Sequence, residues 1–324
     1  MKRKAVAVLV LVAGLALSVS WAKPAVPESN DLLRVLPDGH TCFVLDVKKV
    51  TSSSLWAAIS SSDPAKGALE HMQSEMAEIG IKLTDISTVA VVFLEGAGKD
   101  AVVAVNGAFN QNALLARLRA DQKIKLTSEK YKNFDLYSVR EVADSKKTGD
   151  NFDASFVFYD DGTVVAGPPA SVRASVDVKT GQRASIAQNE KMGAALAQNP
   201  AAAARFAILM NSGMMGSIKT SELPLPDFST ISMAFGAVDV SSGVDLNVTL
   251  RSDTAEHANA IADSLNGLLA MARGFLGAGA GDAKGKAIAD TLKSVTITGV
   301  EADVKITGNL SAEVLAQVLR AGRS

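Results

Sequence analysis

Residues 155–178 read SFVFYDDGTVVAGPPASVRASVDV and contain the unit from which we expect most of the fold to be built. Phe156–Tyr159 and Thr163–Gly167 are rich in aromatic and β-branched residues, which favour strands. Asp161-Gly162 between them is a strong signal for a two-residue hairpin turn. The stretch is therefore predicted to begin with an antiparallel hairpin.

A two-residue turn also sets the register of that hairpin. It would pair Tyr159 with Val164 and Phe158 with Val165. Both faces of the hairpin then carry apolar side chains, so we expect both to be covered by other parts of the protein.

A helix is expected directly after the second strand. Pro168 and Pro169 cannot donate hydrogen bonds to a sheet, so the strand should end before them. Ser171 is then placed to cap a helix over residues 172–178. The complete unit is strand, turn, strand, helix (ββα).

Similar units are expected along most of the chain. They cover residues 89–118, 156–178, 228–275 and 295–319, with an additional hairpin over 124–139 that turns at Lys132-Asn133. We predict an α+β fold with two lobes, each a mostly antiparallel sheet of repeated ββα units with helices packed on one side. Asn199-Pro200 marks the boundary between lobes at residues 31–200 and 201–324. An internal duplication and the independent recurrence of a common unit both explain this order.

The second lobe contains the longest predicted helix. Asp253 and Glu256 have capping-box spacing at its start. Its buried side is expected to carry Ala258, Ile261, Leu265, Leu268, Ala272 and Phe275. In the strand before it, Asp245, Asn247 and Thr249 alternate with apolar residues, which predicts one solvated face. The core is predicted to include Phe156, Phe158 and Val165 in one lobe and Ile261, Leu265 and Leu268 in the other.

The N-terminus has the pattern of a secretory signal peptide over residues 1–22. Lys2, Arg3 and Lys4 precede an apolar run over 5–19, and Ser20-Trp21-Ala22 is a suitable cleavage site. We expect a periplasmic or secreted protein with a short tether at residues 23–30 and no membrane span after cleavage. An uncleaved anchor is the alternative, because the apolar run approaches the length of a short span.

Charge and cysteine content exclude several functional classes. Without residues 1–22 the chain carries 30 basic and 34 acidic residues, a balance that attracts neither nucleic acid nor an anionic membrane surface. Cys42 is the only cysteine, so no intramolecular disulfide can form.

The sequence contains no recognisable catalytic, cofactor or metal motif. HExxH, HxH and GxSxG are absent, and the three histidines are far apart in the chain. His71 and Glu75 are four residues apart on a predicted helix, where such pairs are usually solvated. GDAKGK at residues 281–286 lacks both the spacing and the Ser or Thr of a phosphate-binding loop. We therefore expect a protein that is not an enzyme and has no cofactor.

Three segments carry a resemblance to a group of proteins. They are KYKNFDLYSV (Lys130–Val139), the stretch Phe156–Gly181, and the stretch Val244–Arg273. In their order along the chain they resemble uncharacterised secreted bacterial proteins of unknown function. This resemblance implies an exported α+β protein of a bacterial envelope and provides no catalytic residues.

Two functions are compatible with these observations. The first is a non-catalytic exported or periplasmic protein that binds another protein, and the alternative is a carrier of an apolar, lipid-like ligand held between sheet and helices. Residues 211–227 form a connection without helix or strand periodicity, and loops of this length are often functional. Its apolar side chains, which either fold onto the core or contact a partner or ligand, are Met214, Met215, Ile218, Leu223 and Leu225.

Overall fold

A computed structural model describes residues 29–60, 63–94, 100–142, 153–210, 228–241, 243–279, 283–311 and 314. Within these ranges the chain divides into two compact units. Unit 1 contains residues 29–48 and 66–194, and unit 2 contains residues 49–65 and those from 195 onwards. The predicted signal peptide lies outside the described residues.

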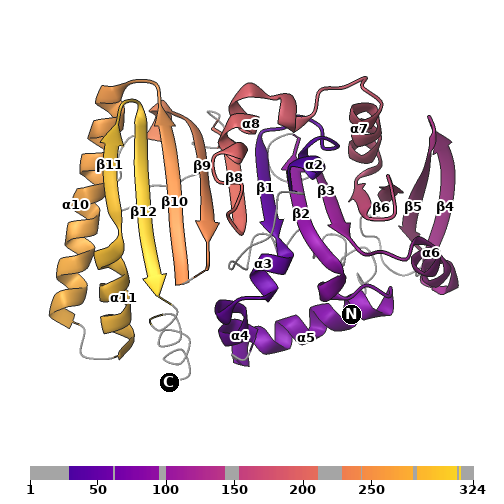
Figure 1. The fold of residues 1–324 in the computed structure, drawn as a ribbon, viewed down its shortest axis with the longest axis horizontal. Coiled ribbons are helices and arrows are strands. Elements are labelled where there is room, and N and C mark those ends of the chain that lie inside the picture. The colour runs from indigo at the N-terminus through magenta and orange to yellow at the C-terminus, as the bar shows by residue number, and fades with distance from the viewer. Residues whose placement is uncertain are drawn as a thin grey trace. The chain divides into compact units, whose positions relative to one another are not determined.

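Unit 1 is a sheet of seven strands in the part of the chain that the structure describes (Figure 1). The neighbouring strands are all antiparallel and follow the order β1-β2-β3-β7-β6-β5-β4. The strands are β1 (Thr41–Asp46), β2 (Ile86–Phe93), β3 (Ala101–Gly107), β4 (Ile124–Tyr131), β5 (Phe134–Glu141), β6 (Asp153–Phe158) and β7 (Thr163–Gly167). The helices near them in the chain are α2 (Ser29–Leu33), α3 (Val47–Thr51), α5 (Asp63–Glu78), α6 (Gln111–Ala120), α7 (Pro169–Lys179) and α8 (Glu190–Ala197).

Unit 2 has five described strands, again antiparallel, in the order β8-β9-β10-β12-β11. The strands are β8 (Ala204–Leu209), β9 (Ile231–Asp239), β10 (Gly243–Ser252), β11 (Thr296–Val300) and β12 (Asp303–Ser311). The helices are α4 (Ser54–Ser60), α10 (Ala255–Gly279) and α11 (Ala283–Ser294). The predicted α+β class with mostly antiparallel sheets is confirmed.

The two units use the same strand order. In each unit, a first strand is followed by a hairpin. A later hairpin then joins the same sheet, and its second strand pairs with the second strand of the first hairpin. This gives β1-β2-β3-β7-β6 in unit 1 and β8-β9-β10-β12-β11 in unit 2. The hairpin β4–β5 is additional and extends unit 1 beyond β6. A shared strand order is what an internal duplication requires.

The predicted register of the β6–β7 hairpin is wrong by one residue. Phe158 pairs with Val164, and the Tyr159 amide donates to the Thr163 carbonyl, so three residues form the turn. Asp160 explains the difference, because its side chain accepts a hydrogen bond from the Gly162 amide at 2.9 Å and closes a wider turn. The expectation that both faces are covered is confirmed for residues 154–157, which are all buried.

Helix α7 begins earlier than predicted. Ser171 is buried inside the helix, and the N-cap is Pro168 with Pro169 at the first helical position. Proline is favoured there because its fixed φ suits a helix and its missing amide proton has no intrahelical partner to lose. Farther along α7, Ser175 hydrogen-bonds to the Tyr159 hydroxyl at 2.8 Å and to the Val35 carbonyl at 2.5 Å. Burial raises the pKa of Tyr159, so this hydroxyl stays protonated.

The additional hairpin β4–β5 is tied to α7 by polar contacts. Lys132, at the predicted turn, adopts a positive φ of 54°, and its ammonium group donates to Asp177 and to Gln182. The Tyr131 hydroxyl donates to the same carboxylate at 3.0 Å. The turn therefore both closes the hairpin and fixes its position against the helix.

The predicted core of unit 1 is confirmed at two of three positions. Phe156 is 1% exposed and Val165 is fully buried, whereas Phe158 is half-buried. The Phe156 ring stacks on Tyr137 with a centroid distance of 5.2 Å and meets Phe158 edge-on at 5.6 Å.

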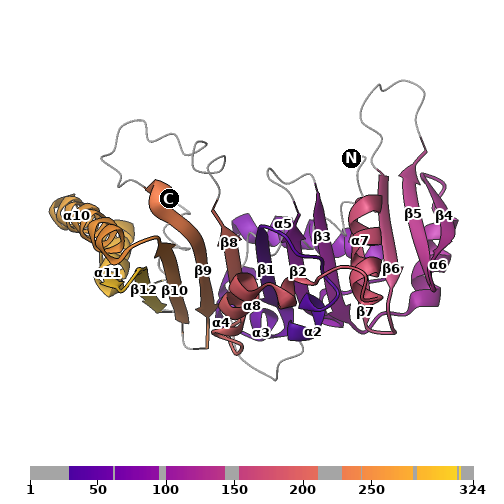
Figure 2. The same cartoon turned by 90° about the horizontal axis from the view of Figure 1, so that it is seen from above.

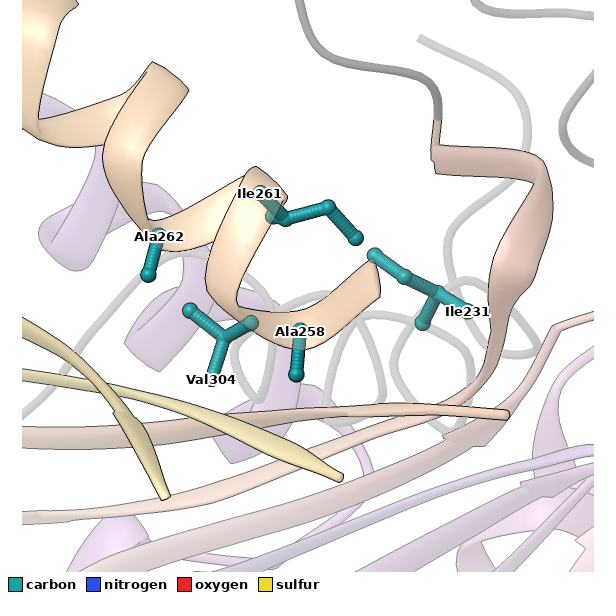
Figure 3. Close-up of a cluster of buried hydrophobic side chains, with 5 residues drawn as sticks. All are labelled: Ile231, Ala258, Ile261, Ala262 and Val304. Atoms are coloured by element: carbon teal, nitrogen blue, oxygen red, sulfur yellow. The ribbon is translucent and has the colours of Figure 1, made fainter. Parts of the chain in front are cut away.

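The core of unit 2 lies between its sheet and α10. Figure 3 shows Ile231 of β9 pointing toward Ile261, and Val304 of β12 lying close to Ala258 and Ala262. Leu265 is only partly buried in this cluster. Phe275, predicted on the buried side, is 85% exposed, and that prediction is wrong. A straight helix drifts by about 20° per seven residues relative to a seven-residue pattern, which turns the far end of the apolar stripe away from the sheet.

The start of α10 also differs from the predicted capping box. The Thr254 hydroxyl, not Asp253, accepts from the His257 amide at 3.2 Å. Asp253 instead binds the His257 ring at 2.7 Å, and this hydrogen bond lowers the pKa of Asp253.

Helix α10 also lies against the outermost strand of unit 2. Figures 1 and 2 both place α10 at the outer end of the strand series. The Asn266 side chain donates to the Ile297 carbonyl of β11 at 3.1 Å. At Gly299 a Cβ atom would overlap the Asn259 side chain, so glycine permits the close approach of helix and strand.

We predict that Phe156→Ala lowers the free energy of unfolding by about 3–5 kcal/mol, since it removes a fully buried ring and leaves a cavity. Phe158→Ala, in the same strand but half-buried, should cost less and serves as the matched comparison. Urea unfolding of the three proteins measures both. A cost below about 1 kcal/mol for Phe156→Ala would show that this hairpin is peripheral.

Candidate functional site

One face of the unit 2 sheet carries polar side chains from three strands. Asp245 of β10 lies directly opposite Asp239 of β9 on one side and Asn309 of β12 on the other. In the next row, Asn247 lies opposite Thr307. We call these five residues the polar face. Of the three β10 positions predicted to face solvent, Asn247 is exposed, Asp245 is half-buried and Thr249 is buried, at 6% exposed.

Hydrogen bonds hold the carboxylates of the polar face in position. The Asn309 amide donates to Asp245 Oδ1 at 2.6 Å. The backbone amide of Ser241 donates to Asp239 Oδ1 at 2.7 Å. Two like charges directly opposite each other in a sheet oppose folding, so this arrangement is not explained by stability.

The polar face forms part of the wall of a cavity of about 550 Å³. The segment 198–202 provides another wall, and Ser294 also reaches the cavity. Its lining contains two carboxylates, four side-chain amides and two hydroxyl groups but no lysine or arginine. Such a lining suits a ligand group that donates hydrogen bonds or carries positive charge.

A second cavity, of about 680 Å³, lies in unit 1 at the end of α7. Its lining includes Arg34 and Arg183, both exposed. Arg34 already has a carboxylate nearby, since its guanidinium lies 3.7 Å from Asp31. Because its arginines are exposed and one is paired, this cavity is the weaker candidate for binding.

Three histidines and one cysteine lie within the described part of the chain. No three His, Cys, Asp or Glu side chains gather there as a metal site would require. His71 lies 3.4 Å from Glu75, which is buried instead of solvated, and Glu75 Oε2 has no hydrogen-bond partner among the described residues. His40 lies 3.0 Å from the Leu94 carbonyl. Cys42 is a buried free thiol.

The sequence-based site residues cannot be placed on this surface. Met214, Met215, Ile218, Leu223 and Leu225 lie outside the described residues. The polar face contains residues that the sequence did not single out, above all Asp239 and Asn309. The alternation in β10 was the available signal, but the register of β9 and β12 was needed to bring the other side chains beside it.

The comparisons with known proteins concern the fold alone. No known protein family matches this sequence, and no curated protein matches it. Crystal form III of a protein named TP0453 is similar in structure, with a TM-score of 0.50 at 11% identity, over 92% of this chain and 98% of that one. Crystal form I of the same protein gives a TM-score of 0.48 at 12% identity, over 90% and 96%.

Along the described ranges, no helix has the length and apolar character needed to cross a membrane.

We predict that Asp239→Asn stabilises the protein by about 0.2–1 kcal/mol at low ionic strength, because it removes one of two facing charges while its oxygen can still accept from Ser241. The gain should shrink in high salt, which screens such charges. Urea unfolding at two salt concentrations measures it. A loss of stability at low salt would contradict repulsion between these carboxylates.

Proposed function

We propose that this chain is a non-catalytic, exported binding protein whose polar face recognises another protein of the bacterial envelope. The observation that carries the proposal is the pair of facing carboxylates at a cavity edge, surrounded by amides and without a cation in the lining. A partner segment with lysine, arginine or free backbone amides would supply the missing donors.

Export is the part of this proposal that rests on the sequence. The basic start, the apolar run and the small residues before Lys23 support a cleaved signal and a periplasmic or secreted protein. The acidic balance that remains after cleavage is compatible with a basic partner surface.

The alternative function is a carrier of an apolar, lipid-like ligand. Its support is compositional, namely 48% hydrophobic residues and nine methionines. The two cavities described above carry carboxylates, amides and exposed arginines, which suit a polar partner better than a lipid chain.

We predict that the protein isolated from its native cells begins at Lys23, because the signal peptidase cleaves after Ala22. N-terminal sequencing of the soluble and membrane fractions measures this. Retention of Met1 in the membrane fraction would instead support the uncleaved anchor.

The binding function can be tested with a matched pair of variants. Thr307→Arg places a large cation in the cavity, whereas Thr298→Arg changes an exposed threonine on the neighbouring strand outside the cavity lining. We expect Thr307→Arg to lose at least 10-fold in affinity for the partner captured from the native envelope, while Thr298→Arg binds as the parent does. Both variants should unfold at nearly the parent temperature. Equal binding by the two variants would remove the polar face as the recognition surface.

A further inference from the structure

Strand β4 forms the outer edge of the unit 1 sheet. Its one strand neighbour among the described residues is β5, and Figures 1 and 2 both place β4 at the end of the unit 1 strand series. Four consecutive residues of β4, at positions 127–130, are exposed. An exposed strand edge offers its backbone groups to another strand.

The register of the β4–β5 hairpin shows which backbone groups are open. The turn at Lys132-Asn133 makes Tyr131 and Phe134 a hydrogen-bonded pair, and such pairs alternate along an antiparallel ladder. The odd-numbered residues of β4 therefore bond to β5, whereas the amide and carbonyl groups of residues 126, 128 and 130 point outward. In the described part of the chain, no hydrogen bond occupies these outward groups.

One face of β4 carries opposite charges placed symmetrically about Thr127. Glu129 is bound to Arg173 of α7, and alternate residues of a strand point to the same side, so Lys125 and Thr127 share this face with Glu129. Lys125 and Glu129 are each two residues from Thr127. The order cation, threonine, anion is complementary to itself when a second strand runs in the opposite direction.

The charge of Lys125 is not balanced within unit 1. Arg140 of β5 lies directly opposite Lys125, and like charges at such positions oppose folding. Among the described residues Lys125 makes no ion pair, whereas Lys130 is bound to Asp135 at 2.9 Å. A carboxylate on the open side of β4 would balance Lys125.

We propose that β4 pairs with β4 of a second copy of this chain, antiparallel and with the two Thr127 residues directly opposite each other. Outward groups must meet outward groups, so residues 126 and 128 of one copy exchange hydrogen bonds with residues 128 and 126 of the other. In this register Lys125 of each copy lies opposite Glu129 of the other. Arg173 binds Glu129 through Oε1, which leaves Oε2 for the incoming lysine.

The neighbouring registers fit less well. Keeping the outward groups together allows the two-fold axis to move only to residue 126 or to residue 128. At 128, Glu129 would lie opposite Thr127 and lose its cation. At 126, the paired stretch shortens from residues 124–130 to 124–128, and Glu129 reaches only Lys123, which precedes the strand.

A second copy explains this symmetry, whereas an unrelated strand would not require it. One strand pair buries less than the roughly 1,200 Å² of a standard interface, so the dimer is weak and depends on protein concentration. It does not involve the polar face, which lies on elements of unit 2.

Sedimentation velocity of charge-swapped full-length chains tests the pairing. Lys125→Glu and Glu129→Lys each turn both opposite-charge pairs into like-charge pairs, so each alone should weaken self-association at least 10-fold. In an equimolar mixture the heterodimer has opposite charges at both pairs, so the mixture should associate as the parent does. Thermal unfolding shows whether each variant keeps its fold. A parent that stays monomeric at high concentration, or a mixture that does not associate, would overturn the proposal and leave Lys125 as a charge that protects the edge.

Cysteine variants test the register independently of charge. Thr127→Cys places two thiols directly opposite each other, with Cα atoms about 4.5 Å apart, and should form a covalent dimer on oxidation. Ser128→Cys, also at an exposed position, lies diagonal to its counterpart at about 7–8 Å and should stay unlinked. Cys42 is buried, and the parent protein measures its background on a non-reducing gel. Linking of Ser128→Cys alone, or equal linking of both variants, would contradict the Thr127 register.

Discussion

The free edge of the returning hairpin is the constraint on which the rest of this fold depends. In both units, the second strand of the later hairpin pairs with the second strand of the first hairpin. The first strand of the later hairpin, β6 or β11, therefore lies on the outside of this arrangement. An uncovered strand edge exposes unpaired amide and carbonyl groups and invites pairing with other chains. Each unit covers this edge in its own way.

Unit 1 covers β6 with another hairpin, since β5 pairs with β6 and Lys132 ties the hairpin to α7 through Asp177. Unit 2 has no strand beyond β11 among its described residues and uses α10 instead, with Asn266 bound to the Ile297 carbonyl. A helix in this position buries one stripe against the sheet and leaves its outer side available. On the other face of the same sheet, Asn247, Thr307 and Asn309 of the polar face are exposed.

The sequence predicted the elements well where one local rule decided the outcome. Lys132-Asn133 forms the predicted turn because a two-residue hairpin loop needs positive φ, and Lys132 adopts it. At Asp161-Gly162 the Asp160 carboxylate did compete, and the register moved by one residue. The apolar spacing of Phe275 suggested burial, but periodicity alone cannot say where along a helix the sheet ends. The polar face was only partly predictable, because Asp239 and Asp245 become neighbours through strand pairing and not through sequence spacing.

The central claim is that α10 lies directly against β11 and covers its edge, and a double-mutant cycle at Gly299 and Asn259 tests it most directly. Gly299→Ala alone should destabilise the protein, because the new methyl group would overlap the Asn259 side chain. Asn259→Ala removes the side-chain clash and leaves only the backbone Cα of residue 259, 3.3 Å from the new methyl group. The account therefore predicts that the double variant recovers most of the lost stability and that the two changes couple by about 0.5–3 kcal/mol in urea unfolding. Additive effects of the two changes would show that the helix and the strand edge are not in contact.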